Sequence, residues 1–333
     1  MLMMYSLLLR DKMMSENASV VFFMKQTEER QELLKHSFAN TSFYFPDKKG
    51  VPSDQILKTA DVLVTFGDDI TESLVSKASS LKWIHVMSAG IEGLPLRLLH
   101  DRGVLVTNSR GIHAEPMSEH AIWAMLDYVK HATRYRMLQQ NKQWDKSIKP
   151  KELTGMTAVF LGTGAIASKT AERANMFGMR TIGVNTDGRP QKHFEQTFSI
   201  EEWDKALRKA DVLINILPYT EQTHGILNKE AFRQLKGHTV FINLGRGKSV
   251  VETDLLDALK LKQIDHAYLD VFAEEPLPLD SPLWDDKAVT ITPHVSAATS
   301  HYMKRALDIF MKNLKAFINN EDLKNIVCFE KGY

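Results

Sequence analysis

The chain has 333 residues, and its 42 lysines and arginines nearly balance its 41 aspartates and glutamates, so the formal net charge is +1. A hydrophobic fraction of 44% with 25% charged residues is typical of a globular protein and excludes the disordered, collagen-like and disulfide-rich classes. The near-zero charge gives no support for nucleic-acid binding, and no apolar run reaches the roughly 20 residues that a membrane-spanning helix needs.

The two ends of the chain indicate a cytoplasmic protein. Residues 1–9 are apolar, but no basic segment precedes them and no small-residue cleavage site follows, so an extended start is a better interpretation than a signal peptide. The single cysteine, Cys328, cannot form an internal disulfide and suits a reducing compartment. Because it lies in the apolar run 326–329, we expect it to pack rather than to react.

The N-terminal part of the chain alternates short apolar runs with polar segments that are compatible with helices. The apolar runs are rich in β-branched and aromatic residues and cover 19–24, 62–66, 83–87 and 104–107. The helical segments between them include 28–36 and 70–78. This alternation predicts parallel βαβ units.

A polar loop at 109–116 interrupts this pattern, and residues 119–142 then predict one long helix. Ala121, Met125 and Val129 fall near helical spacing, and neither glycine nor proline interrupts the segment. The helix could form an oligomer seam or pack inside its own domain, and the sequence leaves both interpretations open.

Six further apolar runs, each followed by a turn or a helical stretch, cover 157–161, 181–184, 212–217, 240–243, 267–271 and 289–292. An amphipathic segment at 300–319 predicts a final helix. We therefore predict an α/β protein in which a Rossmann-type doubly wound parallel sheet domain, residues 104–298, is inserted into a smaller flavodoxin-like α/β domain formed by 1–103 and 299–333.

A glycine-rich turn follows the first of these six strands. Gly162 and Gly164 begin the run GTGAIA at 162–167, which matches G-x-G-x-x-G/A with Ala167 in the last place. Gly162 permits the tight turn, Gly164 lets the backbone approach a pyrophosphate, and a helix N-terminus faces the phosphates. A plain turn is the alternative, but the strand before and the helix after favour a dinucleotide site that includes Ala165 and Ile166.

The residues after the second strand bear on the choice between NAD and NADP. An acidic residue there usually accepts hydrogen bonds from the ribose 2′-hydroxyl of NAD, but this position is Asn185. Thr186 could donate to a 2′-phosphate and Arg189 could neutralise it, whereas Asp187 favours NAD. The pattern favours NADP and leaves NAD open.

Three charged residues stand at the ends of later strands, where open α/β sheets place their active sites. They are Arg246 after the strand 240–243, Glu275 in the segment after 267–271, and His294 after 289–292. Each alone has a structural explanation as part of a turn. Their joint occurrence at successive strand ends is much more specific and predicts a catalytic site.

With these features the chain resembles the D-isomer-specific 2-hydroxyacid dehydrogenase family, including its glyoxylate and hydroxypyruvate reductases. The matching runs are GTGAIA at 162–167, ILPYTEQTHGIL at 216–227, FINLGRG at 241–247, LDVFAEEPLP at 269–278, PLW at 282–284 and TPHVSAAT at 292–299. The resemblance implies a catalytic trio of Arg246, Glu275 and His294. Glu275 is selected over Glu274 because the family pattern places the catalytic residue directly before the proline.

The implied reaction transfers a hydride between NAD(P)H and a small 2-oxo acid, giving a D-2-hydroxy acid. His294 would act as the general acid and base, and the carboxylate of Glu275 would stabilise its protonated form. Arg246 would bind the substrate carboxylate and polarise its carbonyl. The hydride chemistry itself belongs to the cofactor.

The resemblance also assigns roles outside the trio. Backbone N–H groups of Ala89 and Gly90 would bind the substrate carboxylate in a substrate domain. The remaining cofactor contacts would come from Met117, Leu217, Pro218, Leu244 and Asp270, with Asp270 at the nicotinamide carboxamide. A homodimer formed through the dinucleotide-binding domain is expected, and His113 and His120 have no metal-ligand spacing, so no metal is expected.

Two alternatives share this fold. A formate dehydrogenase would carry glutamine in place of the glutamate partner, so Glu275 counts against it. A dinucleotide-sensing corepressor, which is an interaction protein rather than an enzyme, could keep the trio intact, and an assay of turnover would distinguish it. The sequence leaves the natural 2-oxo acid open. Ser296 and Ala297 stand where family members often have Gly-Ser, which is a mild departure beside His294.

Overall fold

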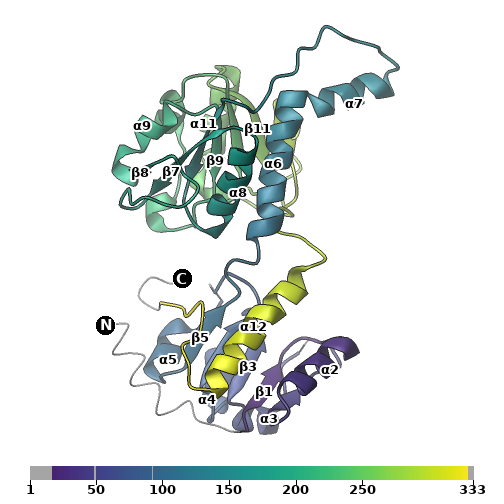
Figure 1. Ribbon diagram of the computed structural model, residues 1–333, viewed down its shortest axis with the longest axis vertical. Helices are drawn as coiled ribbons and strands as arrows, with labels where there is room; N and C mark the ends of the chain where they lie inside the picture. The colour runs from purple at the N-terminus through teal and green to yellow at the C-terminus, as the bar shows by residue number, and fades with distance from the viewer. Residues whose placement is uncertain (1–16, 49, 92, 329–333) are drawn as a thin grey trace. The chain divides into compact units, whose positions relative to one another are not determined.

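The computed structural model describes residues 17–48, 50–91 and 93–328, which form two units (Figure 1). The first unit runs to Ile112 and resumes at Ser300, and the second covers His113–Thr299. The predicted boundary at 103/104 therefore lies nine residues too early. Residues 104–112 belong to the first unit because the strand Leu105–Asn108 is hydrogen-bonded to the strand Trp83–Val86 of the same sheet.

The first unit contains a parallel sheet with helices on both faces. Its described strands are β1 (Ser19–Phe22), β2 (Ser42–Tyr44), β3 (Val62–Thr65), β4 (Trp83–Val86) and β5 (Leu105–Asn108), in the order β2-β1-β3-β4-β5. This is the flavodoxin-like order, so the predicted topology is confirmed. The strand β2 was not predicted, because it is a short and partly exposed edge strand without a continuous apolar run.

Two hydrophobic layers cover this sheet. On one face lie α2 (Glu28–Ser37) and α12 (Tyr302–Ile318), and on the other lie α3 (Asp54–Thr59), α4 (Glu72–Lys77) and α5 (Leu96–Asp101). The helix α12 buries Ala306, Phe310, Leu314 and Phe317, whose spacing of three or four residues places them on one helical face. The predicted helix 300–319 is thus a core helix of the first unit.

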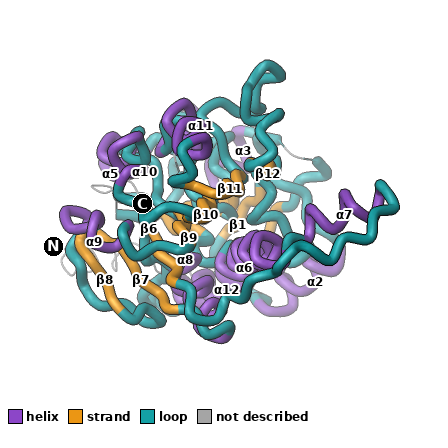
Figure 2. Tube along the Cα trace, turned by 90° about the horizontal axis from the view of Figure 1, so that it is seen from above, coloured by secondary structure: helices purple, strands orange, loops and turns teal. Residues whose placement is uncertain are grey.

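The second unit contains a larger parallel sheet, whose central strands lie side by side in Figure 2. Its described strands are β6 (Thr157–Leu161), β7 (Arg180–Asn185), β8 (Gln196–Ser199), β9 (Val212–Asn215), β10 (Thr239–Asn243), β11 (Ile264–Leu269) and β12 (Val289–Ile291). They follow the order β12-β11-β10-β9-β6-β7-β8, which is the doubly wound arrangement that the sequence predicted. The additional edge strand β8 was missed because its sequence, QTFS, is mostly polar.

Helices cover both faces of this sheet as well. The helices are α6 (Ala114–Lys130) and α8 (Ala165–Met176) on one face, and α9 (Trp203–Leu207), α10 (Lys229–Arg233) and α11 (Glu252–Lys260) on the other. Short 3-10 turns lie at Ile200–Glu202, Glu221–Thr223 and Gly247–Ser249. Along β6 the side chains of Ala158 and Phe160 enter one core, and those of Val159 and Leu161 enter the other. A strand that is buried on both faces appears in the sequence as a continuous apolar run. For this reason β6 could be predicted from the sequence.

The single helix predicted at 119–142 is wrong. The structure has α6 and α7 (Ala132–Gln140), separated by His131, whose φ of 53° is left-handed. The carboxylate of Asp127 accepts hydrogen bonds from the backbone N–H and the hydroxyl of Thr133, at 3.0 Å each, and so fixes the start of α7. The loop predicted to extend to residue 116 also ends earlier, because α6 begins at Ala114 with Pro116 in its first turn.

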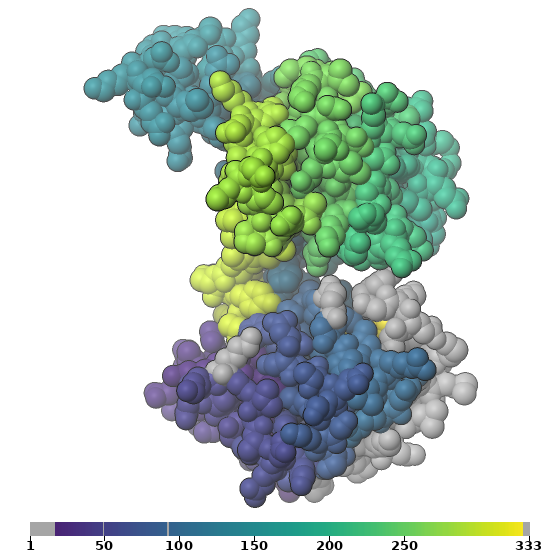
Figure 3. Space-filling view, turned by 180° about the vertical axis from the view of Figure 1, so that it is seen from behind, coloured from purple at the N-terminus to yellow at the C-terminus, as the bar shows by residue number. Residues whose placement is uncertain are grey.

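Residues 131–150, here called the arm, project from the second unit (Figures 1 and 3). No residue of α7 is buried, and Trp144 beyond it is 90% exposed. Among the described residues, no helix combines the length and the apolar character needed to cross a membrane.

Candidate active site

The glycine-rich turn lies between β6 and α8 as predicted. Gly162 has a φ of +95°, and a Cβ at this position would lie 3.2 Å from the carbonyl oxygen of Ile216, so both the turn and the close approach require glycine. Gly164 is the N-cap of α8, and no side chain caps this helix. A Cβ on Gly164 would meet nothing within 4 Å, so the space in front of the helix N-terminus is open.

These features fit the pyrophosphate of a dinucleotide. The backbone N–H groups at the start of α8, including those of Ala165 and Ile166, face open space without a side-chain acceptor. An anion there gains both these donors and the positive end of the helix dipole. Ala167 is fully buried, which lets the helix lie close to the sheet.

The end of β7 offers a hydrogen-bond acceptor without a partner. The side-chain nitrogen of Asn185 donates to the backbone oxygen of Arg189 at 2.9 Å, while its Oδ1 is buried and has no partner among the described residues. A ribose hydroxyl could donate to this oxygen. Arg189 forms an exposed ion pair with Asp187 at 3.0 Å, so the two residues that favour opposite cofactors offset each other, and Thr186 is exposed beside them.

The backbone after β10 packs very closely against its neighbours. Leu244 is buried, and a Cβ on Gly245 would lie 2.8 Å from the backbone oxygen of Leu217. Leu217 is half-buried and Pro218 exposed, so this pair borders the surface at the carboxyl edge of the sheet. Arg246 follows with an exposed side chain, and its Nη1 donates to the backbone oxygen of Gly245 at 3.0 Å.

Glu275 and His294 form a direct hydrogen-bonded pair. The Nδ1 of His294 lies 2.7 Å from Oε2 of Glu275, and the other carboxylate oxygen accepts the backbone N–H of Phe272 at 3.0 Å. Because an ionised carboxylate only accepts, Nδ1 must carry the proton in this bond. The Nε2 of His294 is then the ring nitrogen that can exchange a proton with a third molecule.

A buried carboxylate holds the segment that carries His294. Asp270 is 1% exposed, and its oxygens accept from the Thr292 hydroxyl at 2.6 Å and from the backbone N–H groups of Val295 and Ser296 at 2.9 Å each. Its backbone oxygen accepts the N–H of His294 at 2.9 Å. Since Ser296 contributes only its backbone to this network, the departure at 296–297 leaves these bonds intact.

The beginning of α6 contributes two histidines, His113 and His120, for which the sequence predicted no catalytic role. Burial and the positive charge of Arg246 both lower the pKa of His113. Burial also lowers the pKa of His120, opposed by the negative charge of Asp270, and its Nε2 lies 3.5 Å from the Thr292 hydroxyl. Met117 is buried in the core between α6 and the sheet. In the sequence, these side chains at the start of α6 are marked only by the Ser-Glu-His run at 118–120.

The remaining predicted substrate residues lie in the first unit. Ala89 and Gly90 follow the carboxyl end of β4, and both are half-buried. Among the described residues, no group of three or more histidine, cysteine, aspartate or glutamate side chains could hold a metal ion.

The geometry defines a class of protein, one with a doubly wound parallel sheet and an open helix N-terminus that fits a dinucleotide. Residues 122–296 match the family described as "D-isomer specific 2-hydroxyacid dehydrogenase, NAD binding domain", which is more than half of the chain. Glyoxylate/hydroxypyruvate reductase A of Serratia proteamaculans is 32% identical over 278 residues, covering 78% of this chain and 84% of that protein. The chain belongs to the D-isomer specific 2-hydroxyacid dehydrogenase family, and it is an NAD(P)-dependent dehydrogenase.

Two solved structures extend the likeness to nearly the whole chain. A D-isomer specific 2-hydroxyacid dehydrogenase family protein from Aeromonas salmonicida has a TM-score of 0.78 at 30% identity, covering 94% of this chain and 99% of that one. The NADPH-dependent glyoxylate/hydroxypyruvate reductase of Sinorhizobium meliloti, solved with NADP and sulfate, has a TM-score of 0.73 at 27% identity, covering 95% and 100%. The family resemblance stated from the sequence motifs is thus confirmed.

Proposed function

We propose that this protein reduces short 2-oxo acids, of the glyoxylate and hydroxypyruvate type, to D-2-hydroxy acids. The observation that carries the proposal is the 2.7 Å pair of His294 and Glu275 in the same unit as an open, uncapped helix N-terminus for a dinucleotide. Relatives named glyoxylate/hydroxypyruvate reductase support the substrate class. The glutamate at 275 counts against the formate dehydrogenase alternative.

In this proposal His294 protonates the carbonyl oxygen of the substrate from Nε2. Glu275 fixes the ring through Nδ1, and its negative charge stabilises the protonated imidazole before the transfer. Arg246, exposed at the end of β10, binds the carboxylate and polarises the carbonyl. The nicotinamide supplies the hydride when the dinucleotide is bound. Ala89 and Gly90 offer backbone N–H groups to the carboxylate.

NADPH is the proposed cofactor. Asn185 leaves the usual acidic position neutral, and a neutral residue does not repel a 2′-phosphate. The Sinorhizobium reductase, which was solved with NADP, is an independent reason for the same choice. The ion pair of Arg189 with Asp187 keeps NADH as the second candidate, because either residue could face the ribose.

Turnover with glyoxylate and hydroxypyruvate, compared with NADPH and NADH, tests both parts of this proposal. We expect oxidation of NADPH that depends on either 2-oxo acid, with a higher kcat/KM for NADPH than for NADH. A preference for NADH would show that Asp187 decides cofactor choice. No turnover of any short 2-oxo acid with either cofactor would overturn the proposed substrate class.

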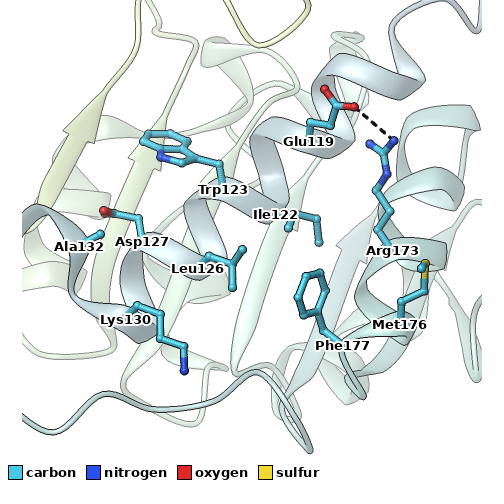
Figure 4. A pocket seen from close by; sticks show the side chains of 10 residues that line it. All are labelled: Glu119, Ile122, Trp123, Leu126, Asp127, Lys130, Ala132, Arg173, Met176 and Phe177. Carbon is cyan, nitrogen blue, oxygen red and sulfur yellow. Dashed lines mark hydrogen bonds and ion pairs between the residues drawn. The ribbon is translucent and has the colours of Figure 1, made fainter.

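We further propose a homodimer formed through the second unit. The arm exposes Trp144 and Met137, which are 90% and 57% exposed, without a covering element. An apolar groove on α6 and α8 of the same unit is lined by residues that include Ile122, Trp123 and Phe177 (Figure 4). A two-fold contact between two copies places each arm against the other copy and covers both apolar surfaces at once.

Light scattering after size-exclusion chromatography measures the oligomeric state directly. We expect twice the chain mass of 37.9 kDa for the unmodified protein. Replacing Trp144 and Met137 together by aspartate should give the mass of one chain. The control Leu279→Asp changes a leucine that is 98% exposed elsewhere in the unit and should leave the dimer intact. An unchanged mass in the double variant would contradict a contact through the arm.

A further inference from the structure

The segment after β4 has its carbonyl groups fixed one after another. Four consecutive backbone oxygens, from residue 87 to residue 90, each accept a hydrogen bond. The donors are the Tyr302 hydroxyl to Met87 at 3.2 Å, the Ser109 N–H to Ser88 at 2.9 Å, the Asn108 side-chain nitrogen to Ala89 at 2.8 Å, and the Ser88 hydroxyl to Gly90 at 3.0 Å. Every peptide plane in this segment therefore has a defined orientation.

The N–H groups of the last three residues of this segment have no such partners among the described residues. Within the described residues, the N–H groups of Ser88, Ala89 and Gly90 donate to no carbonyl or side chain, and all three residues are half-buried. Successive free N–H groups on a fixed backbone form a concave site for an anion. The segment thus presents three hydrogen-bond donors that no described residue accepts.

Peptide geometry links each carbonyl to a particular N–H group. The carbonyl of one residue and the N–H of the next lie in one rigid plane and point in opposite directions. The hydrogen bond from Asn108 to the oxygen of Ala89 therefore sets the direction of the Gly90 N–H. In the same way, the bond from the Ser109 N–H to Ser88 sets the direction of the Ala89 N–H.

Asn108 is itself held at every polar atom. It is 4% exposed, its Oδ1 accepts the N–H of Arg110 at 3.2 Å, and its backbone oxygen accepts the side-chain nitrogen of Asn325 at 3.1 Å. The backbone oxygen of Asn325 accepts the N–H of Asn108 at 3.3 Å. A side chain with so many fixed contacts can hold the Ala89 carbonyl in one orientation.

A buried chain of hydrogen bonds fixes the residues on either side of Asn108. The indole of Trp83 donates to the Thr107 hydroxyl at 2.9 Å, which lies 2.8 Å from Nδ1 of His85. The other ring nitrogen lies 3.3 Å from the Ser109 hydroxyl, which donates to the Val86 oxygen at 3.1 Å. Burial lowers the pKa of His85 to about 3, so the ring is neutral. With Thr107 donating to Nδ1, the proton sits on Nε2 and every group is paired.

We propose that Asn108 is a positioning residue, which aims the Gly90 N–H at a carboxylate and so sets the affinity for the 2-oxo acid. Tyr302 acts in the same way on the Ser88 N–H through the Met87 carbonyl. This inference rests on the proposed function, because it takes the 2-oxo acid as the anion bound by the loop. It predicts an effect on substrate affinity that a purely structural asparagine would not produce.

The test compares Asn108→Ala with Asn313→Ala. Asn313 is 1% exposed in the same unit, and its side chain makes two hydrogen bonds to the backbone of Lys324. Its replacement therefore removes a buried, hydrogen-bonded asparagine, as Asn108→Ala does, and serves as the control for lost stability. We expect Asn108→Ala to raise the KM for glyoxylate about tenfold, as loss of one well-aimed donor does, with kcat and the KM for NADPH changed much less. Asn313→Ala should lower Tm similarly and leave the KM for glyoxylate unchanged.

Tyr302→Phe is the second variant, because it keeps the ring and removes only the hydroxyl that binds Met87. We expect it to raise the KM for glyoxylate as well, and it decides the question if Asn108→Ala does not fold. KM values in both variants equal to that of Asn313→Ala would overturn the inference. An unmodified protein without turnover of glyoxylate or hydroxypyruvate would instead overturn the proposed function, so the two failures are distinct.

Discussion

Replacing His294 by glutamine is expected to lower kcat for glyoxylate reduction by about a hundredfold to ten-thousandfold, the range that general acid catalysis contributes. Glutamine keeps a polar side chain of similar length but has no proton to deliver near neutral pH. The backbone oxygen of Asp270 accepts the N–H of residue 294, and its carboxylate accepts hydrogen bonds from Thr292, Val295 and Ser296. None of these bonds involves the imidazole, so the loop should keep its conformation.

The dissociation constant for NADPH should stay close to that of the unmodified protein, because the glycine-rich turn lies on other strands of the sheet. Fluorescence titration of NADPH measures it independently of turnover. Glu274→Gln is the matched control, since Glu274 is exposed beside Glu275 and has no hydrogen bond to His294. A His294→Gln variant with nearly normal kcat, or one that loses NADPH binding, would contradict the role proposed for His294.

Replacing Gly247 by alanine is expected to destabilise the second unit by more than about 3 kcal/mol, the upper range for overpacking a protein core. A Cβ at this position would lie 1.8 Å from the carbonyl carbon and 1.9 Å from the carbonyl oxygen of Phe272. Both neighbours are backbone atoms, so a rotamer change cannot relieve the overlap. The segments after β10 and β11 would have to separate.

This close approach bears on the site as well as on stability. Arg246 precedes Gly247, and the N–H of Phe272 donates to Glu275, so the same backbone contact spaces two of the proposed catalytic residues. Gly50→Ala is the control, because a Cβ there meets nothing within 4 Å and φ is not left-handed. Urea denaturation measures both variants. Equal free energies of unfolding for the two would show that the backbone contact is not as close as described.

The central strands and the order of the fold could be predicted from the sequence because buried parallel strands are continuous apolar runs. The edge strands β2 and β8 could not, since they are short, partly exposed and largely polar. The break at His131 also has no local signal, because it depends on the carboxylate of Asp127 reaching Thr133. A helical pattern without glycine or proline therefore predicts one helix, whereas the structure has the two helices α6 and α7.

The proposed catalytic residues could be predicted because each stands directly after a strand and together they match family motifs. The hydrogen bonds by which other residues position the site could not be predicted. Asp270 at the nicotinamide stays a prediction, and the hydrogen bonds from its carboxylate to the segment around His294 were not predicted. Asn108 has no sequence signal, because its proposed role depends on the Ala89 carbonyl, nineteen positions away in the chain. Hydrogen bonds between strand ends leave no periodic pattern.

We propose that the protein transfers a hydride to the carbonyl carbon of a short 2-oxo acid, and the fate of that hydrogen tests this proposal most directly. Hydroxypyruvate would be reduced with NADPH deuterated at its transferable position, and the product analysed by mass spectrometry and chiral chromatography. We expect D-glycerate with a single deuterium on the carbon that bore the carbonyl. Unlabelled product, the L-enantiomer, or no product with either NADPH or NADH would contradict this hydride transfer.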